Sequence, residues 1–130
     1  MNNPRITARE WGLLKGAIRR VFSRSELRRS VIDAAIIPGH IDETRPKVKT
    51  WCRCAECGKP EAKSYLQVDH KIPIVPLDKA FADMSLDELV DRVWCDKKNL
   101  TALDKLCHSK KTKSENKERR RIKKEKKDGK

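Results

Sequence analysis

Cys54-Ala-Glu-Cys57, followed by Gly58, is a pair of thiols with the spacing of a metal-binding turn. Two residues between the cysteines let one tight turn direct both sulfurs at a single tetrahedral ion, and glycine can adopt the positive φ that such a turn often needs. A redox dithiol is the alternative, but those pairs usually lie between a strand and a following helix. This pair precedes a predicted strand, so the spacing favours a structural zinc site.

A structural zinc ion needs two more ligands. Cys107 is the best candidate for the third, and the fourth is open among Asp104, Cys95 and Cys52. Asp104 is preferred because it lies three residues before Cys107, so that a DxxC pair would face the CxxC pair. The chain has five cysteines, and an odd number without a recognisable secretory leader argues against a disulfide framework.

A second group of residues has the chemistry that phosphodiester hydrolysis needs. Asp69 and His108 offer a carboxylate oxygen and an imidazole nitrogen to a divalent cation. The adjacent His70 titrates in the range of a general base, and Asn99 can orient it through an amide hydrogen bond. Neighbouring side chains on a regular strand point to opposite faces, so Asp69 and His70 can share a site only if the chain bends. Pro73 favours such a bend.

The order of these motifs resembles the HNH, or ββα-metal, endonuclease family, which is often found in phages and mobile elements. The matching pattern covers residues 51–113: CxxC, a strand ending in DH with a proline soon after, then NL…L…CH..KT. The resemblance implies His70 as general base, Asp69 and His108 as ligands of a catalytic cation, and Asn99 as the orienting residue. That cation would be Mg²⁺ or Mn²⁺, with Ni²⁺ or Zn²⁺ as alternatives.

The resemblance also implies a structural zinc bound by two knuckles that clamp a two-stranded hairpin to a helix. The family pattern reads CxxCH at the second knuckle, whereas this chain has Asp104-Lys-Leu-Cys107-His108. This difference from the family pattern affects only the identity of the fourth zinc ligand, and all the catalytic positions are present. A capping-box pair, Ser85 with Glu88, predicts an additional helix between the two halves of the pattern.

The residues before the CxxC pair are predicted to form two helices within 5–37. Their starts are predicted by two pairs with capping-box spacing: Thr7 with Glu10, and Ser23 with Glu26. Apolar residues recur at steps of three and four, and basic residues, including Lys15, occupy the other faces. The expected buried stripes are Trp11, Leu14, Ile18 and Val21, then Leu27, Val31, Ala34 and Ala35.

The expected fold class is α+β. A small ββα-metal core with a zinc knuckle would carry an N-terminal helical pair, an inserted helix and a basic C-terminal tail. Short strands are predicted at 65–68 and 99–103, with a helix beginning near Asp104. The inserted helix would bury Leu86, Leu89, Val90, Val93 and Trp94. The predicted units are an N-terminal extension (1–50), a nuclease core (51–113) and a flexible tail (114–130).

The formal net charge of +13 points to a polyanionic partner, and DNA is the first candidate. Residues 109–130 hold twelve basic and four acidic side chains with one apolar residue, which predicts a frayed helix or disorder. No apolar run approaches a membrane span, and the N-terminus lacks a secretory leader, so a cytoplasmic protein is expected. The predicted phosphate contacts are Lys71, Lys110, Lys111, Lys113, Arg119, Arg120 and Arg121.

The predicted function is metal-dependent cleavage of DNA, by nicking or double-strand cutting, with weak sequence preference. Two alternatives stay open: a zinc-stabilised nucleic-acid-binding module without catalysis, and a phage accessory subunit that keeps a degenerate nuclease fold. For the phage alternative, a packaging protein such as a terminase is the candidate partner. A redox enzyme using Cys54 and Cys57 is the remaining alternative.

Overall fold

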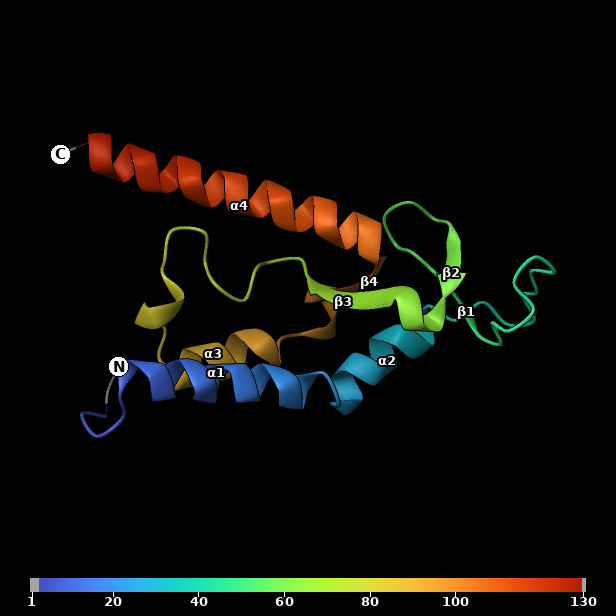
Figure 1. The fold of residues 1–130 in the computed structure, drawn as a ribbon, viewed down its shortest axis with the longest axis horizontal. Coiled ribbons are helices and arrows are strands. Elements are labelled where there is room, and N and C mark those ends of the chain that lie inside the picture. The colour runs from blue at the N-terminus through green and yellow to red at the C-terminus, as the bar shows by residue number, and fades with distance from the viewer. Residues whose placement is uncertain (1–2, 130) are drawn as a thin grey trace.

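The computed structural model describes residues 3–129, so Met1 and Asn2 of the N-terminal extension and Lys130 of the tail lie outside it. This part of the chain is α+β, as predicted, with four α-helices and two small antiparallel sheets. The helices are α1 (Ala8–Phe22), α2 (Glu26–Ala34), α3 (Leu86–Val93) and α4 (Lys105–Asp128). The strands are β1 (Trp51–Arg53), β2 (Pro60–Ala62), β3 (Leu66–His70) and β4 (Leu100–Asp104). Figure 1 shows β3 and β4 between α4 on one side and α1 to α3 on the other.

The two N-terminal helices form as predicted, but the second begins at a different cap. Thr7 and Glu10 make the predicted capping box, with each side chain accepting from the other backbone N–H. Ser23 ends α1 instead of starting α2, because its backbone is still helical and its N–H still donates to a carbonyl of α1. Ser25 has the extended backbone of an N-cap, and its Oγ accepts from the N–H of Arg28.

The buried face of α1 also differs from the predicted stripe. Trp11, Lys15 and Phe22 are buried, whereas Val21 is 62 % exposed and Leu14 is 38 % exposed. The Lys15 ammonium donates to the Phe81 carbonyl and lies 4.9 Å and 4.6 Å from the ring centres of Trp11 and Phe81. These aromatic faces and the carbonyl replace water around the charge, so a lysine occupies a place where the periodicity predicts a polar surface.

The sheet formed by β3 and β4 sets the positions of the candidate site residues. The two strands pair from Leu66 opposite Asp104 to His70 opposite Leu100, close to the two predicted strands. At about 3.4 Å per residue, the two ends of the pairing are about 14 Å apart. Asp104 therefore lies at one end of the sheet and Asp69 and His70 at the other, where two separate sites can form.

The helix α3 covers the end of the sheet next to His70. It begins after Ser85, whose Oγ accepts from the N–H of Glu88, as the sequence predicts. Leu89 and Val93 are fully buried in the core with residues of α1, α2, β3 and β4. Leu86 and Val90, which the periodicity also assigns to the buried face, are each more than a third exposed, and Trp94 is half-buried.

The hairpin of β1 and β2 was not predicted. The CxxC pair lies in its connection, and Gly58 there has the expected positive φ of 74°. The backbone N–H of Ala55 donates to the Ala102 carbonyl of β4 at 2.9 Å, and Ile36 after α2 forms a bridge with Cys52. The hairpin and the N-terminal helices thus share a core with the β3–β4 sheet.

The basic C-terminal segment is a continuous helix in the structure, in contrast to the expected frayed or disordered tail. The helix begins after Asp104, as predicted, and runs across the expected boundary at residue 113 without a break. Side chains of the helix bind backbone carbonyls of the loop after β3: Arg119 those of Val75 and Pro76, and Lys126 that of Asp78. Such contacts, far apart in sequence, add tertiary support that composition does not reveal. None of the helices in residues 3–129 combines the length and apolarity required to cross a membrane.

Candidate functional site

Four side chains meet where the β1–β2 hairpin touches the start of α4. One ligand atom from each of Cys54, Cys57, Asp104 and Cys107 lies within 4.8 Å of all the others. In a tetrahedral zinc site with Zn–S distances of about 2.3 Å, neighbouring ligand atoms are about 3.8 Å apart. The cluster can therefore hold a metal ion such as zinc, with the four residues that the sequence favoured.

Asp104 has two roles that use different oxygens. Its Oδ1 accepts from the Cys107 N–H at 2.7 Å and so caps α4. Its Oδ2 lies 3.2 Å from the Cys57 Sγ, within the cluster, and its N–H donates to the Cys54 Sγ. One carboxylate thus caps α4 and also supplies the fourth member of the cluster. This explains how the chain can have aspartate at the position where the family pattern has cysteine.

The other two cysteines lie outside the cluster. Cys52 is completely buried, and its Sγ lies 4.0 Å from the Ile32 carbonyl in the core. Cys95 accepts a weak bond from the Asn99 side chain at the other end of the sheet. Both are therefore less suitable than Asp104 as the fourth ligand.

The cluster brings together four groups that would repel one another if all of them were ionised. Burial raises the pKa of the Cys54 thiol, but backbone N–H groups of Cys57, Asp104 and Glu56 outweigh that effect and lower it. Burial, together with hydrogen bonds to Cys54, Asp104 and Cys57, raises the pKa of Cys107 to about 12. A thiolate at Cys107 would stand next to other negative groups, and a divalent cation is the species that removes this repulsion.

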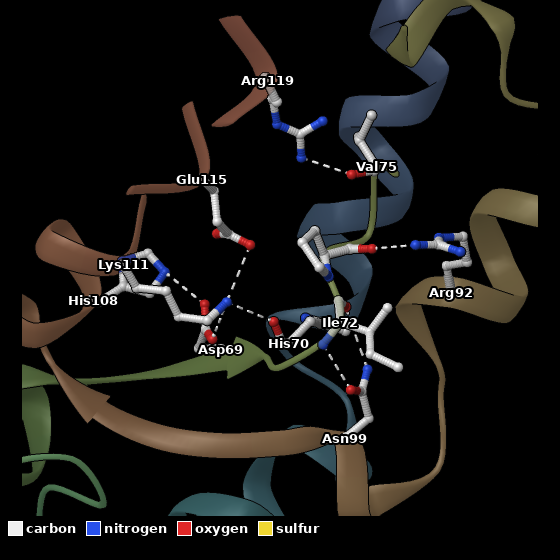
Figure 2. Close-up of polar contacts among 11 residues, drawn as sticks. Asp69, His70, Ile72, Val75, Arg92, Asn99, His108, Lys111, Glu115 and Arg119 are labelled. Carbon is white, nitrogen blue, oxygen red and sulfur yellow. Dashed lines mark hydrogen bonds and ion pairs between the residues drawn. The ribbon is translucent and has the colours of Figure 1, made fainter. Parts of the chain in front are cut away.

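At the other end of the sheet, Asp69 of β3 faces the first turns of α4 (Figure 2). Its Oδ1 is 3.6 Å from the His108 Nε2, and its Oδ2 is 2.9 Å from the Lys111 Nζ. The Asp69 side chain is only 8 % exposed, whereas those of His108 and Lys111 are 32 % and 28 % exposed. The structure therefore brings the predicted ligand pair together at the surface of a cleft, with a lysine beside it.

The Asp69 carboxylate has fewer hydrogen-bond donors than its two oxygens can accept. Its buried Oδ2 has no donor of suitable geometry among the described residues, although the Lys111 ammonium is close. The Lys111 ammonium donates to the His70 carbonyl and to Glu115. Burial lowers the pKa of Lys111, but Asp69 and Glu115 outweigh this and raise it. A buried carboxylate oxygen that lacks an aligned donor is a suitable acceptor for a cation.

His70 is buried and held from one side of its ring. Its Nε2 is 2.8 Å from the Val93 carbonyl, and its ring centre is 5.3 Å from that of Phe22. A carbonyl can only accept, so Nε2 carries the hydrogen and the lone pair of the neutral ring is on Nδ1. Burial lowers the pKa of His70, so the imidazole is neutral at pH 7.

His70, Asp69 and His108 line the same cleft, of about 570 Å³. Adjacent residues of a strand point to different sides, but His70 is the last residue of β3 and the chain turns immediately after it. Asp69 and His70 therefore border one cleft although they are neighbours on the strand.

Asn99 stabilises the turn that follows His70. Its side-chain Oδ1 accepts from the Ile72 N–H at 2.8 Å, and its Nδ2 donates to the Ile72 carbonyl at 3.4 Å (Figure 2). The Asn99 carbonyl also accepts from the Lys71 N–H at 2.7 Å. Asn99 thus contacts the backbone two residues after His70, whereas the sequence suggested a bond to the imidazole itself. Any orienting effect on His70 acts through this turn.

Three of the predicted phosphate-binding residues have partners within the protein, although the Arg121 side chain is still 54 % exposed. Lys111 pairs with Asp69, Arg121 pairs with Glu118 and Glu125 on its own helix, and Arg119 binds the loop after β3. The other four, Lys71, Lys110, Lys113 and Arg120, are exposed.

Arg119 belongs to a pair of arginines that the sequence analysis did not recognise as structural. Arg92 of α3 donates to the Pro73 and Ile74 carbonyls at 2.5 Å and 2.6 Å. Arg119 of α4 donates to the next two, those of Val75 and Pro76, at 2.6 Å and 2.8 Å. The two guanidinium groups therefore hold four consecutive carbonyls of the segment that forms one wall of the cleft. Figure 2 shows Arg92 and Arg119 directed at this segment. No local pattern indicates this, because the partners are far apart in sequence.

We expect Arg119→Ala to lower the free energy of unfolding by about 1–3 kcal/mol, because two half-buried carbonyls lose a charged donor. Arg120→Ala removes the same charge from the next, exposed position and should change it by less than about 0.5 kcal/mol. Urea unfolding followed by circular dichroism measures both. Equal values for the two variants would show that the Arg119 contacts do not hold the loop.

Further residues of the cleft were not predicted as site residues. Thr112, Glu115 and Asn116 of α4 line it beside His108, and Arg19 and Arg28 line it from α1 and α2. Helical spacing from His108 could have indicated the first three, which lie four, seven and eight residues further on. Nothing local indicates Arg19 and Arg28.

Comparisons of the chain with protein-family models, curated proteins and solved structures found no match. The resemblance to HNH endonucleases thus depends on the ordered motifs. The fold and the site define an α+β protein with a cluster of three cysteines and an aspartate that can hold a metal ion, and with a separate cleft lined by Asp69, His70 and His108.

Proposed function

We propose that this protein is a metal-dependent endonuclease of the HNH type that hydrolyses DNA phosphodiester bonds. The observation that carries the proposal is the convergence of three residues on one cleft: Asp69 and His108, 3.6 Å apart, and a buried His70 with its Nε2 already bound to a carbonyl. These are the residue types that a hydrolytic phosphodiesterase needs to hold a cation and to activate water.

The side chains fit a divalent cation such as Mg²⁺ or Mn²⁺ between Asp69 and His108. Carboxylate oxygen and imidazole nitrogen are suitable donors, and Asp69 Oδ2 lacks an aligned hydrogen bond. When bound, the cation would neutralise charge on the scissile phosphate and on the leaving oxygen. Asp69 is fixed on the strand and His108 on the first turns of α4, so both ligands come from rigid elements.

In this proposal His70 is the general base. Its neutral ring at pH 7 can accept a proton at Nδ1 from the attacking water, while the bond from Nε2–H to Val93 stabilises the imidazolium that forms. Phe22 packs against the ring and limits its rotation. Asn99 is a positioning residue, since it holds the turn that follows His70.

The basic face of α4 would bind the phosphate backbone. Lys113, Lys117, Arg120 and Lys124 follow helical spacing and are all exposed. The first three each follow a cleft-lining residue of α4 (Thr112, Asn116 and Arg119), so they lie about 100° further around the helix, and DNA bound along them would reach the cleft edge.

Replacing these four residues by glutamine should flatten the salt dependence of DNA binding. Each phosphate contact on duplex DNA contributes about −0.9 to the slope of log affinity against log salt, so the slope should fall in magnitude by up to about 3.6. Fluorescence anisotropy with a labelled duplex at several salt concentrations measures it. A slope that does not change would place the DNA on another surface.

A zinc-stabilised nucleic-acid-binding module without catalysis is the second candidate. One observation favours it: the Lys111 ammonium already neutralises part of the negative charge of Asp69, which a catalytic cation would otherwise neutralise. It gives no account of the buried His70 or of the Asp69–His108 pair. A phage accessory subunit acting beside a packaging partner such as a terminase would bind DNA in the same way.

The experiment that separates these functions uses supercoiled plasmid and zinc-loaded protein dialysed free of other divalent cations. The nuclease converts plasmid to nicked or linear forms after addition of Mg²⁺ or Mn²⁺, and a binding module only retards it on a gel. Retardation without cleavage in either cation would overturn the proposal.

A further inference from the structure

Lys111 lies beside the cleft with its ammonium group among three oxygen atoms. Its Nζ lies 2.9 Å from the Asp69 Oδ2, 3.0 Å from the His70 carbonyl and 3.2 Å from the Glu115 Oε2. Figure 2 shows the side chain reaching from α4 across to the end of β3, between the two carboxylates. An ammonium group has three hydrogens, and three oxygens surround it here.

The same carboxylate is shared between the ammonium and the imidazole. Asp69 offers Oδ2 to Lys111 and Oδ1 to His108. A divalent cation held by Asp69 and His108 would lie within a few ångströms of the Lys111 ammonium. Two cations so close repel each other, and partial burial weakens the screening that water would provide. The ammonium and the divalent cation therefore compete for Asp69.

We propose that Lys111 is a built-in counter-ion of the Asp69 site, which a divalent cation displaces and which thereby sets the affinity for that cation. This inference rests on the proposed function, because it takes Asp69 and His108 as the cation ligands. Glu115 retains the displaced ammonium, since it lies one helical turn further along α4 and pairs with Lys111 already. Lys111 then remains at the edge of the cleft, beside the bound DNA.

Removing the positive charge of Lys111 should raise the affinity of the Asp69 site for a divalent cation. Lys111→Met keeps most of the aliphatic stem and removes the ammonium, so Mn²⁺ should bind about tenfold more tightly or better. Lys111→Gln removes the charge and keeps a polar amide at the end of the side chain, and it should also tighten binding. Lys110→Met is the matched control, because Lys110 is the preceding residue of the helix and is exposed.

Isothermal titration of Mn²⁺ into zinc-loaded protein, without DNA and at constant ionic strength, tests the inference. Tighter binding to the Lys111→Met and Lys111→Gln proteins than to wild type, with Lys110→Met unchanged, is the expected result. Affinity that is equal or weaker in both Lys111 variants, or absent from all proteins, overturns the counter-ion role. A different result would show that the proposed nuclease function is wrong while the counter-ion role is right. In that case Mn²⁺ binds and the Lys111 variants bind it more tightly, but neither wild type nor any variant cleaves plasmid.

Discussion

His70→Gln is expected to reduce DNA cleavage by about 10³-fold, within the 10²- to 10⁴-fold that a general base contributes. Glutamine has an amide N–H that can still donate to the Val93 carbonyl, so the buried acceptor keeps a partner. It offers no nitrogen lone pair of comparable basicity to the attacking water. The variant should bind DNA with the affinity of the wild type, because His70 is almost completely buried.

Single-turnover cleavage of a labelled duplex under saturating protein measures this effect without a contribution from binding. His40→Gln is the control, since His40 lies in the loop before β1, against Trp51, and does not line the cleft. The control should cleave at the wild-type rate. Cleavage by His70→Gln within a few-fold of wild type, in a variant with normal thermal stability, would exclude His70 as the base.

Removal of metal from the Cys54, Cys57, Asp104 and Cys107 cluster is expected to lower the free energy of unfolding by on the order of 5 kcal/mol or more. Zinc binding to folded small domains supplies comparable or larger free energies, and the whole stability of a domain of this size is only about 5–15 kcal/mol. The cluster joins the β1–β2 hairpin to the start of α4, so both should lose order together. Thermal unfolding with and without a chelator, together with zinc analysis by mass spectrometry, measures this effect. We expect one zinc ion per chain in addition to any cation in the cleft.

Asp104→Asn tests whether the carboxylate is a ligand as well as a helix cap. Asparagine can accept the Cys107 N–H and keep α4, but it lacks the negative charge, so zinc affinity should fall at least tenfold. Asp96→Asn is the matched control, because Asp96 caps a short turn in the same way and lies outside the cluster. Unchanged zinc affinity in Asp104→Asn would remove Asp104 from the ligand set.

Local sequence signals predicted the parts of the fold that depend on local chemistry. Side-chain caps predicted the starts of α1 and α3, and the DxxC spacing predicted the fourth member of the cluster. The Ser23 cap was wrong because capping-box spacing occurs by chance in a serine-rich turn, where Ser25 has the required backbone. The capping-box spacing predicted a helix start correctly only where the cap residue itself has an extended backbone, as Thr7 and Ser85 do.

Features that depend on distant partners could not be predicted. Lys15 was assigned to a polar face because its carbonyl partner, Phe81, is 66 residues away. Lys111 and Arg119 were assigned to phosphate because their partners, His70 and Val75, are 41 and 44 residues away. In a chain this basic, charge alone does not separate cations that stabilise the fold from cations exposed to a ligand.

We propose that the cleft at the end of β3 cleaves DNA with the help of a cation other than the one that the Cys54, Cys57, Asp104 and Cys107 cluster can hold. The most direct measurement titrates Mn²⁺ into dialysed, zinc-loaded protein with supercoiled plasmid and records zinc content at each point. The account predicts no cleavage before Mn²⁺ is added, saturable conversion to nicked or linear plasmid afterwards, and a constant zinc content. A folded, zinc-loaded protein that binds plasmid and leaves it supercoiled at every Mn²⁺ concentration would contradict it.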